Sequence, residues 1–409
     1  MSAVRRDIAV PRGFSFSSAH CGLKKRKADL ALFVSESPAS AAAIFTTNCV
    51  QAAPVCLSRR HIAEAASRTR AIIINSGNAN CSSGPVGLEA SETTAASVAQ
   101  AVGCSPQQVL VCSTGVIGVA LPVVKLIRAV PNLVAGRQPT PEAFLRATHA
   151  IMTTDSRPKW AAARCRLGGK EVRLIGCAKG AGMIHPNMAT MLAFVCTDAA
   201  APHGVLQEAL RRVASRTFNA ITVDGDTSTN DTAIVLANGA SGCRPIEGSG
   251  SEYEQFCSAL ESVCRPLALA IVEDGEGAQR VIEIEVRGAE SNSDADRVAR
   301  TIANSPLVKT AFAGADANWG RILAAAGRSG VNFDPQRAAI RMAGIQVYKR
   351  GVACRFNERA AHKKLLERYV QVRVDLGVRD GGAASEGTAR IWTCDFTAEY
   401  VRINASYRS

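Results

Sequence analysis

No two cysteines in this 409-residue sequence have the spacing Cys-x-x-Cys, although the sequence contains 14 cysteines. Without such pairs a zinc site is not indicated, and the dispersed positions do not resemble a disulfide framework. Several cysteines, such as Cys112 and Cys196, lie inside apolar runs, where a free thiol behaves as a small hydrophobic side chain. The pattern is therefore typical of a reduced protein, and we expect no bound metal.

Long uninterrupted hydrophobic runs are also missing. The start of the chain, Met1–Ile8, contains no apolar core of signal-peptide length. No later run of about 18 apolar residues indicates a membrane span. The composition, with 47% hydrophobic and 20% charged residues, is that of a globular chain. These features predict a soluble cytoplasmic protein that does not bind membranes.

Acidic residues are outnumbered, and the formal net charge is +13. Such an excess can attract nucleic acid, which is the main alternative to an enzyme that the composition leaves open. However, the basic residues are spread along the chain. Their longest run is Lys24-Lys25-Arg26-Lys27, and few aromatic side chains lie nearby to stack bases. We therefore expect no nucleic-acid partner.

A calcium-binding loop is excluded by missing residues. Asp224, Asp226 and Asn230 resemble the start of such a loop, but its sixth and twelfth positions hold Thr229 and Val235. The glycine and the bidentate glutamate that the loop requires are absent. Asp224 and Asp226 are expected to organise a turn.

The sequence from Lys179 to Thr197 carries the strongest indication of chemistry. Its first half contains turn formers such as Gly180 and Pro186, and its second half, Thr190 to Val195, is an apolar run of strand length. A threonine hydroxyl therefore stands where a loop enters a rigid strand, an arrangement that suits a nucleophile. A loop that merely leads into a core strand is the plainer alternative.

Two other predicted strands end in small polar residues. The strand at Arg70–Asn75 continues into the amide-rich loop Asn75–Gly84, and the strand that begins at Val109 ends in Ser113-Thr114-Gly115. A glycine after a hydroxyl residue lets a backbone N–H and an O–H point into one cleft, as an oxyanion requires. Such Thr-Gly pairs also end strands that have no such role.

Helices and strands mix along the whole sequence, without a repeat of fixed period. Strands are predicted at Asp29–Val34 and Ala42–Thr46 with a turn between them, and a helix at Gly87–Val102 with Gly103 as its C-cap. Thr140 is predicted to be the N-cap of another helix. The mixture places the chain in the α/β class, and its length predicts two to three domains or lobes.

Five motifs stand in one order along the sequence. They are Ser113-Thr-Gly-Val-Ile-Gly, Lys179-Gly-Ala-Gly-Met-Ile-His-Pro-Asn-Met-Ala-Thr-Met-Leu, Thr222-Val-Asp-Gly-Asp-Thr-Ser-Thr-Asn-Asp, Gly314-Ala-Asp-Ala-Asn-Trp-Gly-Arg-Ile-Leu and Tyr400-Val-Arg-Ile-Asn-Ala-Ser-Tyr. Together they resemble one family, the ornithine acetyltransferases of arginine biosynthesis, which are bifunctional glutamate N-acetyltransferase/amino-acid acetyltransferases. The resemblance covers about Val10 to Ser409.

The resemblance implies a layered αββα sandwich with an additional C-terminal lobe from about residue 275. It also implies that the chain cuts itself between Ala189 and Thr190, so that residues 1–189 form an α chain and 190–409 a β chain. Two of each would assemble into a heterotetramer. After the cut, the α-amine of Thr190, with an ordinary pKa of about 8, can act as the base for its own hydroxyl.

The family's reaction is a ping-pong transfer. Thr190 takes the acetyl group from N-acetylornithine and passes it to glutamate, while Thr114 and Gly115 form the oxyanion hole. The substrate-contact positions are Thr153, Lys179, Thr190, Glu276, Asn404 and Ser409. Lys179 offers a cation for the α-carboxylate and Glu276 a carboxylate for the ornithine ammonium group. No cofactor is expected. His185 precedes the nucleophile but belongs to the other chain after cleavage, so a catalytic role is not expected for it.

Three segments depart from the family pattern: Cys81–Gly84, Val119-Ala120 and Asp375–Ala389. They leave open whether acetyl-CoA is also an acetyl donor and whether the enzyme performs a related acyl transfer in specialised metabolism. The nearest alternative is an N-terminal-nucleophile amidase or aminopeptidase, in which water replaces glutamate as the acceptor.

Overall fold

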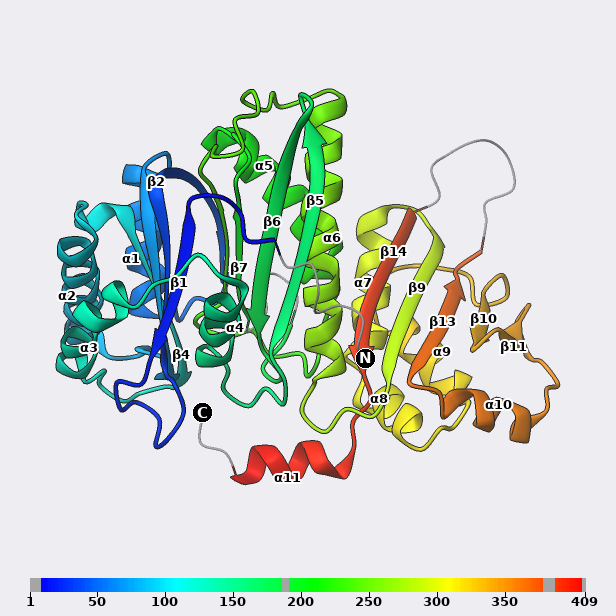
Figure 1. The fold of residues 1–409 in the computed structure, drawn as a ribbon. Coiled ribbons are helices and arrows are strands. Elements are labelled where there is room, and N and C mark those ends of the chain that lie inside the picture. The colour runs from blue at the N-terminus through cyan, green and yellow to red at the C-terminus, as the bar shows by residue number, and fades with distance from the viewer. Residues whose placement is uncertain (1–8, 186–190, 378–386, 407–409) are drawn as a thin grey trace. The chain divides into compact units, whose positions relative to one another are not determined.

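The chain, as a computed structural model, is described over residues 9–185, 191–377 and 387–406, which fold into two compact units (Figure 1). The first unit contains the described residues up to Asn219 together with Asp226–Ile271. The second contains Ala220–Gly225 and the described residues from Val272 onward. Each unit has its own β-sheet.

The sheet of the first unit has the strand order β4-β3-β2-β8-β7-β6-β5, with β1 also paired to β2. Its strands are β1 (Phe14–Ala19), β2 (Leu30–Phe45), β3 (Thr69–Asn78), β4 (Val109–Val116), β5 (Lys159–Leu167), β6 (Lys170–Lys179), β7 (Leu192–Thr197) and β8 (Thr232–Ala237). The long strand β2 joins two halves of this sheet, because its first part pairs with β1 and β3 and its last part pairs with β8.

The sequence-based prediction of two short strands in this region is wrong. A single strand, β2, runs through the predicted turn, and its pairing with β3 is irregular between Val34 and Ala39. Pro38 is exposed within that irregular segment. A proline is tolerated there because a bulged, exposed position needs no ladder N–H.

Helices cover the outer faces of both halves of the sheet. The helices of the first unit are α1 (Ala53–Ala65), α2 (Gly84–Val102), α3 (Val123–Ala135), α4 (Pro141–Ala150), α5 (His203–Arg216) and α6 (Ser251–Glu273), with the short 3-10 helix η1 (Pro106–Gln108). Helices α1, α2 and α3 pack on the β1–β4 half through one apolar cluster. Helix α5 contacts β2 and β8, and Val263 of α6 lies against Gly176 of β6.

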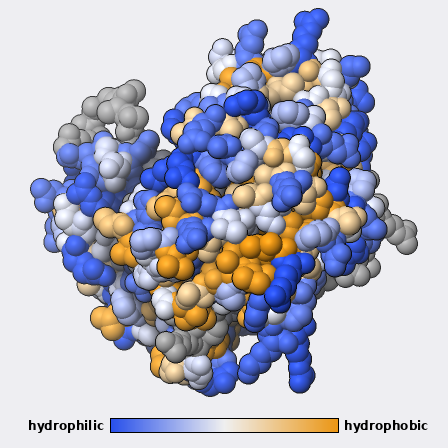
Figure 2. All heavy atoms as spheres, turned by 90° about the vertical axis from the view of Figure 1, so that its left-hand side faces the viewer, coloured by the Kyte–Doolittle hydropathy of each residue, from blue (hydrophilic) through white to orange (hydrophobic). Residues whose placement is uncertain are grey.

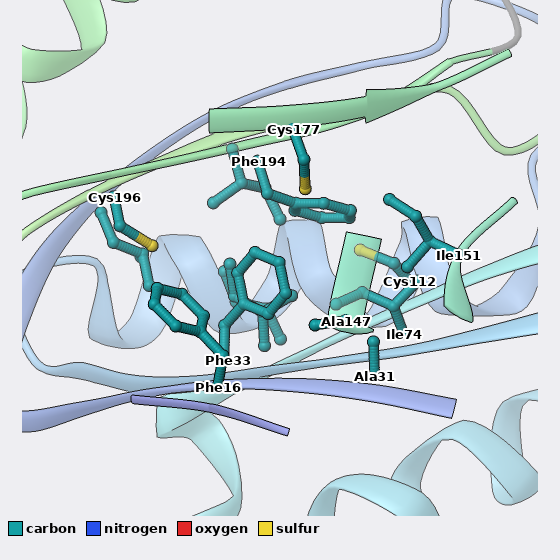
Figure 3. Packing of buried hydrophobic residues seen from close by; sticks show 14 of the residues in the cluster. Phe16, Ala31, Phe33, Ile74, Cys112, Ala147, Ile151, Cys177, Phe194 and Cys196 are labelled. Atoms are coloured by element: carbon teal, nitrogen blue, oxygen red, sulfur yellow. The ribbon is translucent and has the colours of Figure 1, made fainter. Parts of the chain in front are cut away.

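The two halves of the sheet face each other across a second apolar cluster, which also includes residues of α4. The rings of Phe33 on β2 and Phe194 on β7 lie 5.6 Å apart, edge to face (Figure 3). The rings of Phe16 and Phe144 lie 5.1 Å apart, also edge to face. On β2, β3 and β4, alternate side chains enter this cluster, while the others enter the cluster that packs on the helices. The layers are therefore helix, sheet, sheet, helix, and the predicted αββα sandwich is confirmed.

Both predicted helix caps are present. Gly103 ends α2 in the left-handed conformation, with a φ of 77°, and the Thr140 side chain accepts a hydrogen bond from the Ala143 amide at the start of α4.

Figure 2 shows the face of the molecule that lies at the left of Figure 1, where hydrophobic atoms gather between hydrophilic ones. Val86, Val119 and Val124 are exposed hydrophobic residues of the first unit.

Helix α6 differs from the other helices in its length and apolar composition. Among the described residues it is the one helix that is long and apolar enough to cross a membrane by length and composition. However, 56% of its most apolar window is buried, as in a core helix. Phe256, Leu260 and Val263 are among its buried side chains.

The second unit contains a six-stranded sheet in the order β12-β11-β10-β13-β9-β14. Its strands are β9 (Val281–Ala289), β10 (Ala339–Met342), β11 (Ile345–Lys349), β12 (Val352–Ala353), β13 (Tyr369–Asp375) and β14 (Gly387–Cys394). Its helices are α7 (Asn292–Ala303), α8 (Pro306–Ala313), α9 (Trp319–Gly327), α10 (Glu358–Leu365) and α11 (Ala398–Ser406). Helix α7 packs on β9 and β14.

Candidate active site

The predicted oxyanion residues lie beside the amide-rich loop. Strands β3 and β4 are parallel, so Ser76 is opposite Thr114 and Gly77 is opposite Gly115. Gly115 has a φ of 134°, and a Cβ added to it would lie 2.3 Å from the carbonyl carbon of Gly77. Only glycine fits this approach. The close packing therefore fixes where the Thr-Gly pair ends β4.

Lys179 connects this strand end to the opposite half of the sheet. It is the last residue of β6, its side chain is buried, and its Nζ donates a hydrogen bond to Thr114 Oγ1 at 3.1 Å. A hydroxyl has one hydrogen to donate and two lone pairs. Because the Thr114 oxygen accepts from the ammonium group, its own hydrogen is left to donate elsewhere. That is the orientation an oxyanion donor needs.

Asp155 holds two other predicted site segments together. Its Oδ1 accepts hydrogen bonds from Lys159 Nζ at 2.6 Å and from the Gly180 amide at 2.7 Å, and its Oδ2 accepts from the Thr153 amide at 2.9 Å. Burial acts to raise the pKa of Asp155, but the charges of Lys179 and Lys159 and the Gly180 amide outweigh it and lower that pKa to about 2. The carboxyl group is therefore an anion that positions Thr153 and the residue after Lys179.

Sequence reasoning did not assign Asp155 a role. The available signal was a compact polar segment, Thr153-Thr154-Asp155, directly after a helix, with Lys159 four residues after Asp155. Those residue types are also common in ordinary turns. Only the folded backbone shows that Gly180, far away in the sequence, donates to the same carboxylate.

Met191, which follows the predicted cleavage position by one residue, is hydrogen-bonded to Asp231 and Thr232 at the start of β8. The Met191 amide donates to Asp231 Oδ1 at 2.9 Å, and the Met191 carbonyl accepts from the Thr232 amide at 3.0 Å. Asn230 donates from Nδ2 to the carbonyl oxygens of Ala79, at 2.7 Å, and Ser113, at 2.9 Å. The segment before β8 thus ties the start of β7 to the end of β4.

Two predicted substrate contacts lie in the second unit. Glu276 is 8% exposed, and its Oε2 accepts a hydrogen bond from Asn404 Nδ2 of α11 at 2.8 Å. Gly277 follows with a φ of 72° and packs so closely on Tyr400 that a Cβ would lie 2.5 Å from the Tyr400 nitrogen. The carboxylate and the amide therefore form one polar pair in that unit.

Three residues of the predicted site, Thr190, Ala189 and Ser409, lie outside the residues that the structure describes. Within the described residues of the first unit, Thr114, Gly115, Thr153 and Lys179 are connected through Asp155 and the Lys179 ammonium group. This arrangement combines a hydroxyl donor, a backbone turn and buried cations. It suits the stabilisation of an oxyanion and the binding of a carboxylate.

Comparisons with known proteins agree on one family. The model of the ArgJ family matches residues 15–409 of this chain. The arginine biosynthesis bifunctional protein ArgJ of Caldanaerobacter subterraneus subsp. tengcongensis is 44% identical over 406 residues, which is 98% of each chain. The protein of the same name from Geobacter sulfurreducens is 47% identical over 401 residues, which is 97% of this chain and 99% of that one.

Among solved structures, the chain is similar to the arginine biosynthesis bifunctional protein argJ of Bacillus halodurans. The match has a TM-score of 0.48 and 43% sequence identity, and it covers 51% of this chain and 96% of that one.

Proposed function

The chain belongs to the ArgJ family, and on this basis we propose that it is a self-cleaving acetyltransferase of arginine biosynthesis that acts through Thr190. It transfers the acetyl group of N-acetylornithine to glutamate. The relatives are bifunctional by name, and a second activity, acetylation of glutamate from acetyl-CoA, is part of the proposal. The chemistry needs no bound cofactor.

The observation that supports the proposal most directly is the hydrogen bond from Lys179 Nζ to Thr114 Oγ1. It presents the Thr114 hydroxyl at the end of the first unit where the Met191 amide, one residue after Thr190, is held by Asp231. An oxyanion donor placed in this way lowers the barrier of an acyl transfer by about 3 kcal/mol. The site therefore supports acyl chemistry on a group attached at residue 190.

Self-cleavage uses the same hydroxyl. Thr190 Oγ attacks the carbonyl carbon of Ala189, the C–N bond to Thr190 breaks, and the proton of the hydroxyl passes to the released nitrogen. Water then hydrolyses the resulting ester, which frees the Ala189 carboxylate and the Thr190 hydroxyl. The new α-amine has an ordinary pKa of about 8 and can take the proton of its own hydroxyl in each later turnover.

Acetyl transfer then proceeds in two half-reactions. Thr190 Oγ attacks the acetyl carbonyl of N-acetylornithine, Thr114 and Gly115 stabilise the oxyanion, and the ornithine amine leaves with the proton. The amine of glutamate attacks the acetyl-enzyme in the reverse sense. Lys179 binds the α-carboxylate, Glu276 binds the ornithine ammonium group, and Thr153, Asn404 and Ser409 complete the contacts with the substrates.

The intact mass of the purified protein tests the central step. We expect two chains, which separate between Ala189 and Thr190, and a single uncut chain for Thr190→Ala. Acetate and N-acetylglutamate are then measured with N-acetylornithine as donor, with and without glutamate. A single wild-type chain with full activity would refute the proposal. Acetate release that does not depend on glutamate would assign the site to an amidase. Size-exclusion chromatography tests the proposed assembly of two α and two β chains.

A further inference from the structure

Lys24 is a partly buried lysine of the first unit that the proposed reaction does not use. Its Nζ donates hydrogen bonds to three backbone carbonyl oxygens, those of Met152 at 2.7 Å, Ala150 at 3.1 Å and Ala28 at 3.2 Å. An ammonium group has three N–H donors and no acceptor. All three donors of Lys24 are therefore occupied by the protein, and the side chain holds backbone atoms in place.

Lys24 and Asp155 hold the two ends of one peptide group. The Met152 carbonyl accepts from Lys24 Nζ, and the Thr153 amide of the same peptide group donates to Asp155 Oδ2 at 2.9 Å. A peptide group is planar, so two fixed atoms leave it little freedom. The cation lies at the oxygen and the anion at the N–H, which agrees with the direction of the peptide dipole. Two opposite charges therefore define where the backbone of Thr153, a predicted substrate contact, begins.

Lys24 also lies beside the strand end that carries the predicted oxyanion residues. A Cβ added to Gly77 would lie 3.3 Å from Lys24 Cγ, and Gly77 is opposite Gly115 in the pairing of β3 with β4. The amide of Lys24 donates to Oδ2 of the buried Asp29 at 2.9 Å. The side chain thus reaches from an anchored backbone, past Gly77, to the end of α4.

Charged groups of both signs act on the Lys24 amine within the part of the chain that the structure describes. Burial lowers the pKa of Lys24 from its ordinary value to about 8, and the charges of Lys179 on β6 and of Lys27 act in the same direction. The charges of Asp29, just before β2, and of Asp155, after α4, oppose them. Lys24 is therefore charged at about pH 7 and mostly neutral above about pH 9.

We propose that Lys24 is a positioning residue for the binding of the substrate carboxylate, and that it holds Thr153 in place only while its amine is charged. The inference rests on the proposed function, in which Lys179 and Thr153 contact the substrates. A neutral amine has two N–H groups and one lone pair. One of the three carbonyl oxygens then loses its donor and faces a lone pair, which repels it. The end of α4 and the peptide group between Met152 and Thr153 are held less firmly as a result.

The loss of charge acts on substrate binding in the same direction. The charges of Lys24 and Lys179 interact, so a carboxylate bound at Lys179 is attracted by both. The oxyanion donors Thr114 and Gly115 make no hydrogen bond to Lys24 Nζ, whose three donors go to other residues. Loss of the Lys24 charge should therefore raise KM more than it lowers kcat.

The variant Lys24→Met keeps most of the side-chain length but removes the charge and the donors. The probe is glutarate, which is glutamate without its amine and cannot take the acetyl group. Its inhibition constant Ki against glutamate is measured between about pH 7 and pH 9.5, where both of its carboxyl groups are ionised. We expect Ki to be about 10-fold higher in the variant at pH 7 and less than about twofold higher at pH 9.5, where the wild-type amine is itself neutral.

The quotient of the variant and wild-type Ki values separates Lys24 from other groups that titrate. The amine of Thr190 titrates in both proteins, so its effect cancels. The matched control is Lys125→Met on α3, because the exposed Lys125 also donates through Nζ to a backbone carbonyl, that of Gly22, at 3.1 Å. Its quotient should not change with pH. A lysine that only stabilised the end of α4 would affect the amount of active enzyme and leave Ki unchanged.

The outcomes are distinct. A wild type that transfers no acetyl group refutes the proposed function, and this inference with it. An active wild type together with a quotient for Lys24→Met that is constant over the pH range refutes the inference alone. A Lys24→Met variant that loses kcat but keeps the wild-type Ki also refutes it, because the side chain would then not act on binding.

The variant Lys24→Arg decides the matter if Lys24→Met does not fold. A guanidinium group keeps its charge throughout this pH range. The Ki of Lys24→Arg divided by that of the wild type should therefore fall roughly 5- to 10-fold between about pH 7 and pH 9.5, as the wild type alone loses its cation. A quotient that does not fall overturns the inference.

Discussion

The two groups of predicted site residues carry opposite charges. In the first unit, the charges of the buried amines of Lys159 and Lys179 act on the carboxylate of Asp155. Burial and the charge of Lys179 also lower the pKa of Lys24 to about 8. In the second unit, the carboxylate of Glu276 is paired with the neutral amide of Asn404.

The difference corresponds to what the two proposed substrates share and what separates them. N-acetylornithine and glutamate both have an α-carboxylate, which suits the cationic group of the first unit. Their side chains end in an ammonium group and a carboxylate, respectively, and only the ammonium group suits Glu276. The first unit should therefore act on both half-reactions, and the second should discriminate between them.

The variant Lys179→Met should have the largest effect. It removes the donor to Thr114 and the cation for the α-carboxylate, and kcat/KM should fall roughly 100- to 1000-fold for both substrates. Steady-state kinetics with each substrate varied in turn check this. The control is Lys170→Met, at the exposed start of the same strand. A loss confined to one substrate would contradict a role shared by both half-reactions.

The variant Asp155→Asn should act mainly through stability. The pKa of Asp155 is about 2 in the fold and about 4 in an unfolded chain, so the carboxylate stabilises the fold by about 2 to 3 kcal/mol. This contribution is complete above pH 4 to 5 and is lost as the pH falls toward 2. Urea unfolding of both proteins should show a difference at pH 7 that narrows by pH 3. An equal difference at the two pH values would exclude this linkage.

Asp155 is also an example of a site residue whose role could not be predicted from the sequence. The αββα layers, the helix caps and the motif positions were predictable because they depend on local patterns and on family resemblance. The continuous strand β2 was not predictable, because the residues between Val34 and Ala39 suit a bulge within one strand as well as a turn between two. The bond between Thr153 and Asp155 is local, but Gly180 and Lys179 reach that carboxylate only through tertiary pairing.

The variant Glu276→Gln should sharpen the contrast between the two groups. Glutamine keeps an acceptor for Asn404 but removes the charge. The KM for N-acetylornithine should rise about 10-fold, because its ammonium group loses a charged partner. The KM for glutamate should stay constant or fall, so the glutamate half-reaction is the internal control. Equal increases in both values would assign Glu276 a structural role.

The variant Asn404→Ala should have the smallest effect. It removes a donor that orients the Glu276 carboxylate but leaves the charge, so the KM for N-acetylornithine should change by no more than about threefold. Alanine also favours helix, so α11 should not be weakened. Kinetics together with thermal melting check both points. If Asn404→Ala impaired N-acetylornithine as strongly as Glu276→Gln, the proposed contact of the Asn404 amide with the substrate would contribute as much as the charge of Glu276. The discrimination would then depend on a hydrogen bond as well as on charge.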